Sequence, residues 1–557
     1  MFIKTTRNAT GQAYYHLVES YRNDGKVKQR VLLSLGKQEE GKLEQLAAAL
    51  SKHSEVIRAM ESAQKIDVKH AYIAGPLLIL ERVMEELGVE KIVRQLAARH
   101  ERLGFDLFKT LFTLIASRWV EPVSKLELYE KWIDRFYPVL VDNNVRLHQF
   151  YRCLDVMAKH KEEIENFLYR YGRDLFSMQT DIVLYDLTTL RFESTREDVD
   201  SLRRFGYSKE HRHDCTQVVL GLLTDTDGIP LSFDVHPGNT FEGHTLKGIV
   251  DRIRKKFQIR RFIFVADRGL FSSDNLTYIK EQKGEFVVGM RLGKLQKPND
   301  VFYDTKKYKW INDGLAIYET TYKGDRLIIT WAKARADKDR KTREEVLEKI
   351  RKKLSSSKAT AKHFITQKPF KKYILIDGKK PILNQRAIDE EEKKDGYFGI
   401  ITNVTGMSAV QIVTQYKELW HIEDAFGELK GNLQVRPIFH WTNERIIGHL
   451  TVCFLAYLCQ AHLTKKLRQK KVALKSKAID ENIIRERALT APTAIAELAS
   501  LLVVPVETPS KRVWIRTDIG PNGVQLFKTM ELGLCHYILD SDLRILGGIC
   551  IPMVLKS

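Results

Sequence analysis

Hydrophobic and polar residues between 408 and 431 alternate with the period of an α-helix. The apolar positions are Ile412, Leu419, Ile422, Phe426 and Leu429. At about 100° per residue they fall on one stripe, so the segment predicts an amphipathic helix, and Ser408 is suited to cap its start.

Tyr416, Glu423 and Lys430 are spaced seven residues apart along this predicted helix. That spacing places a phenol, a carboxylate and an ammonium in a column at the edge of the apolar stripe. A carboxylate half-sunk against a core needs a partner, and a metal ion is one candidate. The simpler alternative is a surface helix with charges along its flank.

The N-terminal part of the chain predicts a β-hairpin followed by helices. Residues 1–36 alternate around Asn23-Asp24-Gly25, which is a hairpin-turn signal. The stretch 39–65 is charged and helical in pattern, and 70–172 contains several segments with three-to-four spacing. Small helical domains often place a helix in a DNA groove, although nothing here marks a recognition helix.

From Asp181 onward the pattern becomes mixed α/β. Strands are predicted at 181–190, 215–224, 229–235, 261–266 and 285–290, with helices at 245–257 and 273–282. In a mixed sheet of this order the first and fourth strands are expected to be neighbours.

A β-rich stretch interrupts this order between 292 and 395. Strands are predicted at 310–320, 326–333 and 373–376 and a charged helix at 338–354, which indicates an inserted subdomain. The chain returns to the core at 398–402, before the helix at 408–431 and a second helix at 443–468.

Together these patterns predict an α/β core with an insertion, preceded by a hairpin and a helical region. The expected N-terminal divisions are a hairpin module with a connecting helix (1–66) and a helical domain expected to bind DNA (67–174). The core is expected in two parts (175–291 and 397–470), separated by the β-rich insertion (292–396). A mainly helical C-terminal region (471–557) is expected to follow.

Composition narrows the class of partner. The 557-residue chain has a formal net charge of +20, which attracts polyanions such as nucleic acid. We find no signal-peptide pattern and no apolar run of about 20 residues, so no membrane span is expected. Six cysteines occur without any Cys-x-x-Cys pair, which favours reduced thiols, a cytoplasmic protein and no structural zinc.

Three carboxylates stand out in the core. Asp186 lies inside a hydrophobic strand, Asp267 closes another strand, and Glu423 lies on a helix able to cover both. A buried Asp is costly unless a positive group compensates it. Such a set can bridge two Mg²⁺ ions about 4 Å apart, an arrangement suited to phosphoryl transfer. Each carboxylate taken alone is a weak signal, because a strand-end Asp followed by Arg-Gly is more commonly a turn or a helix cap.

The order of these residues resembles that of the DDE transposases of bacterial insertion sequences. Tyr416, Glu423 and Lys430 match the signature Tyr-x2-Arg-x3-Glu-x6-Lys. Further similar stretches are Gly206-Tyr-Ser-Lys-Glu, Gln217-Val-Val-Leu-Gly-Leu, Asp267-Arg-Gly, Asp395-Gly-Tyr-Phe-Gly and Arg445-Ile-Ile-Gly-His, so the likeness spans about 180–460. The signature Arg is Leu419 here, which removes a positive charge.

The resemblance implies an RNase H-like core and cut-and-paste DNA transposition. Asp186, Asp267 and Glu423 would be catalytic and hold two Mg²⁺, with Mn²⁺ able to substitute. The implied partners are double-stranded DNA, as terminal inverted repeats and as target, and a second subunit in a homodimer on DNA. The implied location is the bacterial cytoplasm, at the nucleoid.

Two alternatives remain open at this point. Leu419 favours a catalytically weakened or domesticated protein that binds DNA as a regulator, and an RNase H-like nuclease without strand transfer is the other. The end sequence, target preference, excision route, free oligomeric state and activity of this copy are not written in the sequence.

Other residues are weaker candidates for DNA contact. Arg268, Tyr416 and Lys430 are expected near phosphate at the cut, against the alternative of local ion pairs and a packed phenol. The resemblance also suggests that Trp310 or Trp331 stacks on a flipped base, although a lone Trp in a β-rich subdomain is more often a core residue. His211 and His213 fit a loop better than a metal site. The basic run 465–477 is either a solvated face or a phosphate-tracking one.

Overall fold

The structure is a computed structural model of the chain. It describes residues 2–540 except 24–25, 38–69, 101–102, 173–180, 198–200, 209–211, 213, 242, 244, 256–261, 271, 295–299, 356–367, 378–379, 476–485, 489, 508–511 and 534–537. The helix expected over 39–65 and the two histidines His211 and His213 therefore lie outside the described residues.

The N-terminal strands form a small antiparallel sheet of their own. Its strands are β1 (Phe2–Arg7), β2 (Ala13–Asn23) and β3 (Lys26–Lys37). The pairing of β2 with β3 from Asn23–Lys26 outward confirms the hairpin expected around residues 23–25, and β1 adds a third strand that the sequence pattern did not indicate.

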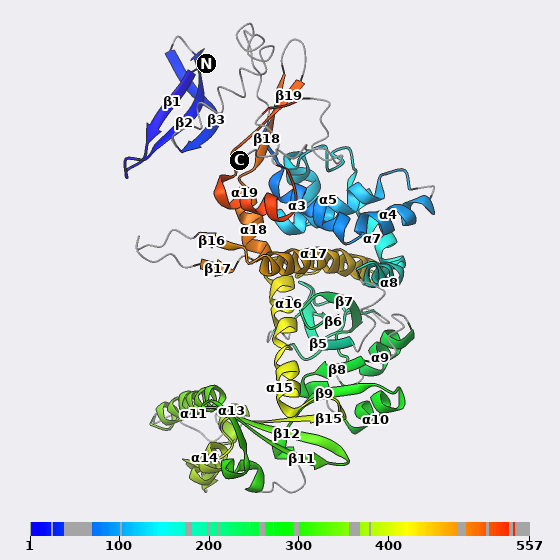
Figure 1. The fold of residues 1–557 in the computed structure, drawn as a ribbon, viewed down its shortest axis with the longest axis vertical. Helices are drawn as coiled ribbons and strands as arrows, with labels where there is room; N and C mark the ends of the chain where they lie inside the picture. Colours follow the sequence, from blue (N-terminus) through cyan, green and yellow to red (C-terminus); the bar gives the residue numbers. More distant parts are fainter. Residues whose placement is uncertain are drawn as a thin grey trace.

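A helical region follows, as the three-to-four spacing predicted. It contains α3 (Gly75–Glu86), α4 (Val89–Ala98), α5 (Leu107–Val120), α6 (Lys125–Glu127), α7 (Leu147–Lys159) and α8 (Lys161–Tyr171). Asp106 caps α5 by accepting a hydrogen bond from the backbone N–H of Lys109. Helices α3, α5 and α7 of this region pack against α17 (Asn443–Gln469), which Figure 1 shows lying between the helical region and the large sheet.

Nine strands form one mixed sheet. They are β5 (Asp181–Arg191), β6 (Gln217–Thr224), β7 (Pro230–Pro237), β8 (Phe262–Ala266), β9 (Glu285–Met290), β10 (Lys309–Asn312), β11 (Leu315–Tyr322), β12 (Asp325–Ala332) and β15 (Tyr397–Thr402). Their order is β10-β11-β12-β15-β9-β8-β5-β6-β7, and β5, β8 and β9 run parallel. The first and fourth strands, β5 and β8, are neighbours as expected.

Helices cover both faces of this sheet. α9 (Leu246–Lys255) and α10 (Ser273–Glu281) lie on one face, while α15 (Ala409–Lys417), α16 (Trp420–Lys430) and α17 lie on the other. Alternate residues of each strand enter the two cores, so Val183, Tyr185 and Leu187 of β5 face α9 and α10. Leu184 and Leu190 face α15, α16 and α17.

The helix expected over 408–431 is in fact two helices. Ser408 caps α15 with a hydrogen bond from Gln411, as the sequence indicated. The chain then tightens at Glu418 and Leu419, where backbone bonds join residues three apart, such as Leu419 N–H to Tyr416 O (3.3 Å). A tightened turn therefore separates Tyr416, on α15, from Glu423 and Lys430, on α16.

The expected insertion is only partly a unit of its own. β10, β11 and β12 extend the large sheet through the pairing of β12 with β15. Beyond them lie α11 (Lys333–Leu354), α13 (Lys368–Lys371), the two-stranded sheet of β13 (Ile374–Asp377) and β14 (Lys380–Leu383), and α14 (Gln385–Glu392). These elements share a small separate core of Leu347, Ile350, Phe370, Tyr373, Ile374 and Ile388.

The helix α17 corrects one expectation from the sequence. It is long enough to cross a membrane and contains an apolar stretch with a mean hydropathy of 1.5, although no such run was expected. However, 83% of that apolar stretch is buried inside the protein, between the helical region and the sheet. Its apolar side chains therefore serve the core of the folded chain.

The C-terminal region packs back on the helical region. It contains β16 (Ala473–Lys475), β17 (Glu486–Ala488), α18 (Ala491–Leu498), β18 (Leu502–Glu507), β19 (Arg512–Arg516), α19 (Gly520–Thr529) and β20 (Ile538–Asp540). β18 pairs with β4 (Tyr72–Ile73) at the start of the helical region, so the described C-terminal residues close the same body.

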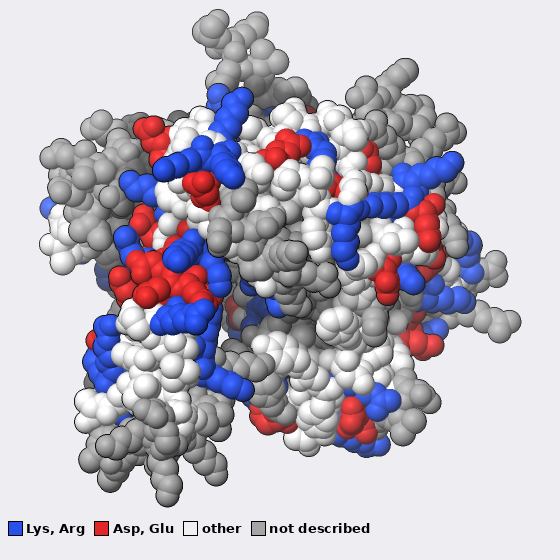
Figure 2. Space-filling view, turned by 90° about the horizontal axis from the view of Figure 1, so that it is seen from below, with Lys and Arg blue, Asp and Glu red and all other residues white. Residues whose placement is uncertain are grey.

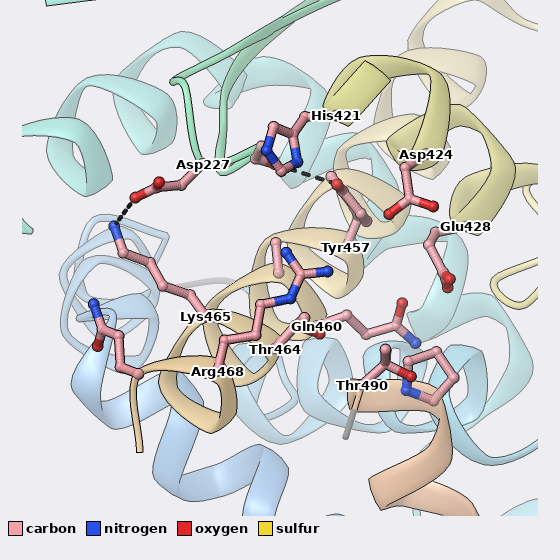
Figure 3. Close-up of a pocket in the computed structure, with 14 residues that line it drawn as sticks. Asp227, His421, Asp424, Glu428, Tyr457, Gln460, Thr464, Lys465, Arg468 and Thr490 are labelled. Carbon is pink, nitrogen blue, oxygen red and sulfur yellow. Dashed lines mark hydrogen bonds and ion pairs between the residues drawn. The ribbon is translucent and has the colours of Figure 1, made fainter. Parts of the chain in front are cut away.

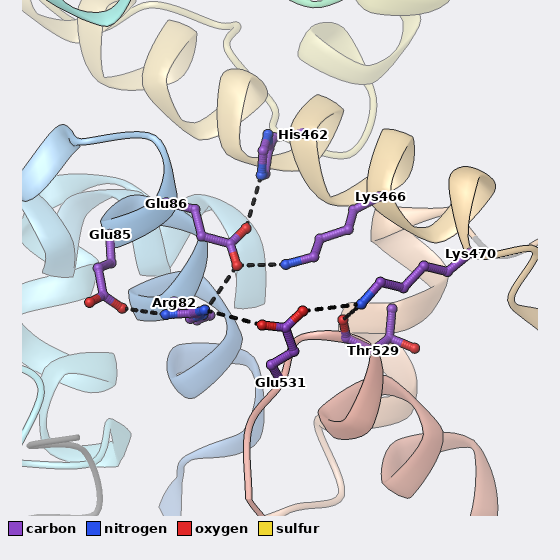
Figure 4. Close-up of polar contacts among 8 residues, drawn as sticks. All are labelled: Arg82, Glu85, Glu86, His462, Lys466, Lys470, Thr529 and Glu531. Carbon is purple, nitrogen blue, oxygen red and sulfur yellow. Dashed lines mark hydrogen bonds and ion pairs between the residues drawn. The ribbon is translucent and has the colours of Figure 1, made fainter. Parts of the chain in front are cut away.

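Charged side chains join α3, α17 and the segment after α19 (Figure 4). Glu86 of α3 accepts from Lys466 (2.5 Å) and pairs with His462 (3.0 Å), both on α17, and lies 3.1 Å from the Nε of Arg82. Burial opposes the charge of Glu86, but the hydrogen bonds from His462 and Lys466 outweigh it and lower its pKa to about 2.

Replacing Glu86 by Ala should lower the free energy of unfolding by about 2 kcal/mol at pH 7, because Arg82, His462 and Lys466 lose their shared partner. Since the folded pKa lies below the ordinary 4.5, this contribution is present above pH 4.5 and is lost as the pH falls toward 2. Urea unfolding at several pH values measures both effects.

Glu85→Ala is the matched control, because Glu85 is exposed and contacts only Arg82 among the residues in Figure 4. It should cost less than about 0.5 kcal/mol. An equal loss in the two variants, or a Glu86→Ala deficit that does not shrink in acid, would contradict this account.

Candidate active site

The strand register brings Asp186 and Asp267 to adjacent positions. Tyr185 of β5 lies opposite Ala266 of β8 in the parallel pairing, so the next residue on each chain is one of these aspartates. Leu184 and Val265, two residues earlier on each chain, both lie in the core beneath α15 and α16. With a period of two, both carboxylates belong to that same face.

Glu423 lies on the helix that covers this face. α16 contacts β5 through a buried stripe of Ile422, Ala425, Phe426 and Leu429. Glu423 is exposed, and its neighbour Ile422 is fully buried, so the carboxylate stands at the edge of the contact between helix and sheet. Two neighbouring strands and one covering helix thus supply the three carboxylates.

The three carboxylates are on one side of the sheet but are not gathered into a ready-made metal site. Among the described residues, no group of three or more His, Cys, Asp or Glu is placed to hold a metal ion. The donor set itself fits Mg²⁺, since Mg²⁺ prefers a few carboxylate oxygens and keeps the remainder of its shell for water and phosphate. A metal here would be held by Asp186 and Asp267 from the sheet and by Glu423 from α16.

Tyr416 is bonded directly to one of these carboxylates. Its hydroxyl donates a hydrogen bond to Oδ1 of Asp267 at 3.0 Å. Burial, followed by the charge and hydrogen bond of Asp267, raises the pKa of Tyr416 well above its usual range. The phenol therefore stays protonated and acts as a donor that fixes the orientation of Asp267.

Gly289 of β9 leaves the space that this tyrosine needs. A Cβ at Gly289 would overlap the Tyr416 hydroxyl and would lie 3.2 Å from the backbone nitrogen of Arg268. The ring of Tyr416 also packs against Phe398 of β15, with 5.1 Å between ring centroids. Four strands, β15, β9, β8 and β5, thus contribute to the setting of Asp186, Asp267 and Tyr416.

The remaining expected DNA contacts surround the same face. Arg268 is exposed in the short turn Arg268–Leu270 directly after Asp267, and Lys430 is half-buried at the last position of α16. Leu419, in place of the signature Arg, packs against the core at the junction of α15 and α16. Arg445, near the start of α17, pairs with Asp155 at 3.3 Å.

The basic run 465–477 is partly used inside the protein. Lys465 pairs with Asp227 (2.6 Å), Lys466 with Glu86 (2.5 Å), and Lys470 donates to the carbonyl of Thr529 (2.8 Å). These three side chains link α17 to neighbouring elements. Basic residues elsewhere give the surface its charge, and Figure 2 shows Lys and Arg spread over the face seen from below, with Asp and Glu in fewer patches.

A cavity of about 210 Å³ lies beside α16 but does not contain the three carboxylates (Figure 3). His421, Asp424 and Glu428 line it from α16, while Gln460 and Arg468 reach into it from α17. Burial, with the charge of Asp424 adding to it, raises the pKa of Glu428. The cavity lies between the turn that joins β6 to β7 and the helices α16 and α17. Asp186 and Asp267 do not line it.

Comparison with known families decides the assignment. Residues 177–459 match the family model of the transposase DDE domain, and residues 3–62 match the N-terminal domain of the IS1634 family of transposases. The chain belongs to the DDE transposases. This family implies an RNase H-like core, DNA binding, DNA transposition and the use of divalent metal ions, and the IS1634 match makes the protein an insertion-sequence transposase. A search of curated proteins found no match.

Two features of the transposase site were not visible in the sequence. The bond from Tyr416 to Asp267 joins residues 149 positions apart, and no local pattern announces it. The chain after α16 is likewise held from afar, because Arg118 of α5 donates to the carbonyls of Leu433 (3.4 Å) and Gln434 (3.2 Å). A polar residue inside the apolar helix α5 was the available signal for the second contact.

The two aromatic candidates of the transposase's insertion lie on the edge strand β10 and on β12, the third strand from that edge. Trp310 of β10 is 51% exposed and meets Trp331 of β12 edge to face, with 5.5 Å between ring centroids. Trp331 is half-buried and packs against the core beneath α9 and α10. Stacking on a base stays a prediction for both rings.

Gly289→Ala should lower the free energy of unfolding of the transposase by about 1–3 kcal/mol, because Tyr416 must move away from Asp267. Adding Tyr416→Phe should restore part of the loss, since the overlap is with the hydroxyl. Chemical denaturation of both variants and of Tyr416→Phe alone completes the double-mutant cycle.

Gly427→Ala on α16 is the matched control, because nothing lies within 4 Å of a Cβ at that position. It should be neutral or stabilising by up to about 1 kcal/mol. Strictly additive effects of Gly289→Ala and Tyr416→Phe would contradict the contact.

Proposed function

We propose that this transposase cuts DNA at the ends of its element and joins the freed 3′ hydroxyl to target DNA, with Asp186, Asp267 and Glu423 as the catalytic residues. The observation that supports this is the adjacent placement of Asp186 and Asp267 on parallel strands, on the face that α16 covers with Glu423. Three carboxylates from neighbouring elements are the type of ligand that phosphoryl transfer by two metal ions uses.

The proposed cofactor is a pair of Mg²⁺ ions, for which Mn²⁺ would substitute. When bound, they would activate the attacking oxygen and stabilise the leaving oxygen of the phosphodiester. The protein's part is to position and orient its carboxylates. Tyr416 does this for Asp267 through its hydrogen bond, and β5 does it for Asp186 through pairing on both sides.

Arg268, Tyr416 and Lys430 are proposed to contact DNA beside the cut. Arg268 follows Asp267 directly and is exposed, which suits a phosphate contact. One hydroxyl proton serves one acceptor at a time, so Tyr416 would contact phosphate only after releasing Asp267. The proposed substrates are the terminal inverted repeats and target DNA.

Assembly and location follow from this chemistry. Transposition requires two element ends to be held together, so we propose a homodimer on DNA. We propose the bacterial cytoplasm, at the nucleoid, as its location, in keeping with the free thiols of Cys153, Cys215, Cys453 and Cys459.

The same proposal includes a division into domains at residues 66, 174, 291, 396 and 470. It includes an insertion within the core and a DNA-binding role for the helical region.

A DNA-binding regulator is the second candidate function. The observation that favours it is Leu419, an apolar residue packed at the junction of α15 and α16 where the signature has Arg. Arg445, a positive residue near the start of α17, is paired with Asp155. A nuclease that cuts without joining is separated from both by strand-transfer products.

Alanine at Asp186, Asp267 or Glu423 should reduce cleavage of a labelled duplex carrying the element end by about 10³-fold or more, because several kcal/mol of charge stabilisation are lost. Binding to the same duplex should change less than about threefold, since affinity comes mainly from phosphate contacts. Gel assays in Mg²⁺, Mn²⁺ and EDTA measure cleavage, and fluorescence anisotropy measures binding.

Asp424→Ala is the control, because Asp424 is the next carboxylate on α16 but faces the cavity of Figure 3. Normal cleavage by any of the three variants would remove that residue from the site. Tight binding by the wild type with no cleavage in either metal would favour the regulator, and cleavage gained by Leu419→Arg would then identify the missing charge.

A further inference from the structure

Five aromatic side chains are exposed together at one end of the large sheet. Tyr207 is 73% exposed, Phe241 66%, Phe439 64%, Trp441 55% and Phe205 38%. They come from three loops, between β5 and β6, between β7 and α9, and between α16 and α17. A concentration of exposed rings on a folded chain marks a binding surface. We refer to these five residues as the aromatic end surface.

The three loops form one fixed platform. Gln217 donates from Nε2 to the carbonyls of Tyr207 (3.1 Å) and Gly238 (2.8 Å), which joins the first loop to the second. The backbone N–H of Leu202 donates to Oδ1 of Asn443 at 2.9 Å, which joins the first loop to the start of α17, directly after the third loop. A Cβ at Gly206 would overlap the carbonyl of Gly238, so these backbones are packed as closely as glycine allows.

An arginine supports the largest ring of this surface. The guanidinium of Arg203, only 1% exposed, lies 4.2 Å from the centroid of Trp441, and that of Arg196 lies 5.9 Å from it. Positive charge against a ring orients it and adds attraction for a polyanion. The surface therefore combines flat apolar faces with nearby positive charge on a chain of net charge +20.

The aromatic end surface lies along the path from the proposed cut. The backbone N–H of Ile438 bonds to the carbonyl of Arg191 at 3.2 Å, which fixes the third loop at the end of β5. Asp186 precedes Arg191 by five residues on the same strand, roughly 16 Å at about 3.3 Å per residue. This distance corresponds to about five nucleotides at about 3.4 Å each.

We propose that the aromatic end surface binds unpaired bases of the DNA strand next to the cleaved position. Rings of this kind stack on any base that is free, whereas the bases inside a duplex are already stacked on one another. A strand opened at the cut supplies such bases within reach of Tyr207, Phe439 and Trp441. This inference rests on the proposed function for the position of the cut. It adds a contact that forms only where the two DNA strands have separated.

The test compares single-stranded and duplex DNA without any cleavage. Fluorescence anisotropy measures binding of labelled (dT)12 and of a 12-base-pair duplex to the full-length Glu423→Ala protein. Tyr207→Ala and Phe439→Ala, which remove exposed rings, should each weaken (dT)12 binding by about tenfold and duplex binding by less than twofold. Tyr207→Trp should retain (dT)12 binding.

Tyr129→Ala is the matched control, because Tyr129 is 41% exposed but belongs to the helical region. It should leave both affinities unchanged. Equal losses for the two DNA forms, or no loss in either ring variant, would overturn the proposal. So would a change of oligomeric state in Tyr207→Ala, seen by sedimentation, because the surface would then join two copies of the chain.

The proposed function fails in a different way. If the triad variants still cleave but (dT)12 binding depends on Tyr207 and Phe439, the surface stands and the catalytic assignment falls. If the triad variants lose cleavage but the ring variants bind (dT)12 normally, the reverse holds.

Discussion

The parallel pairing of β5 with β8 is the constraint on which the site depends. It places Asp186 and Asp267 at adjacent positions and on one face, and a shift of one residue in the register would turn one carboxylate to the opposite core. The register is fixed on both faces by apolar contacts, Leu184 and Val265 on one side and Tyr185 and Phe264 on the other. Ordinary packing thus fixes the positions of two like charges.

The other elements of the site place their side chains relative to Asp186 and Asp267. α16 brings Glu423 to the edge of the same face, and its position depends on the tightened turn at Glu418 and Leu419. Tyr416 reaches across β9 to Asp267, which requires Gly289 to have no side chain. The helical region secures the exit from α16 through Arg118, so a helix far from the sheet takes part in holding Glu423 in place.

The local sequence pattern predicted most of the helices and strands, but it did not predict the break within 408–431 or the long-range strand pairing. The strands, including β9 at Glu285–Met290, and the cap at Ser408 follow from alternation and capping, which are properties of neighbouring residues. The break within 408–431 could not be read, because every residue there suits a helix and the tightening arises in the packed state. The extension of the sheet by β10, β11 and β12 depends on the pairing of β12 with β15, a contact between residues about 70 apart.

The candidate residues of the site follow from chemistry and from their order in the sequence, whereas their contacts do not. A charged residue inside a hydrophobic strand indicated Asp186, whereas the partner of Tyr416 is set by the fold. The most direct measurement is anomalous X-ray diffraction from crystals of the protein with element-end DNA and Mn²⁺. Our account predicts manganese peaks bounded by Asp186, Asp267 and Glu423. Peaks elsewhere, or a complex whose manganese ions contact none of these carboxylates, would contradict it.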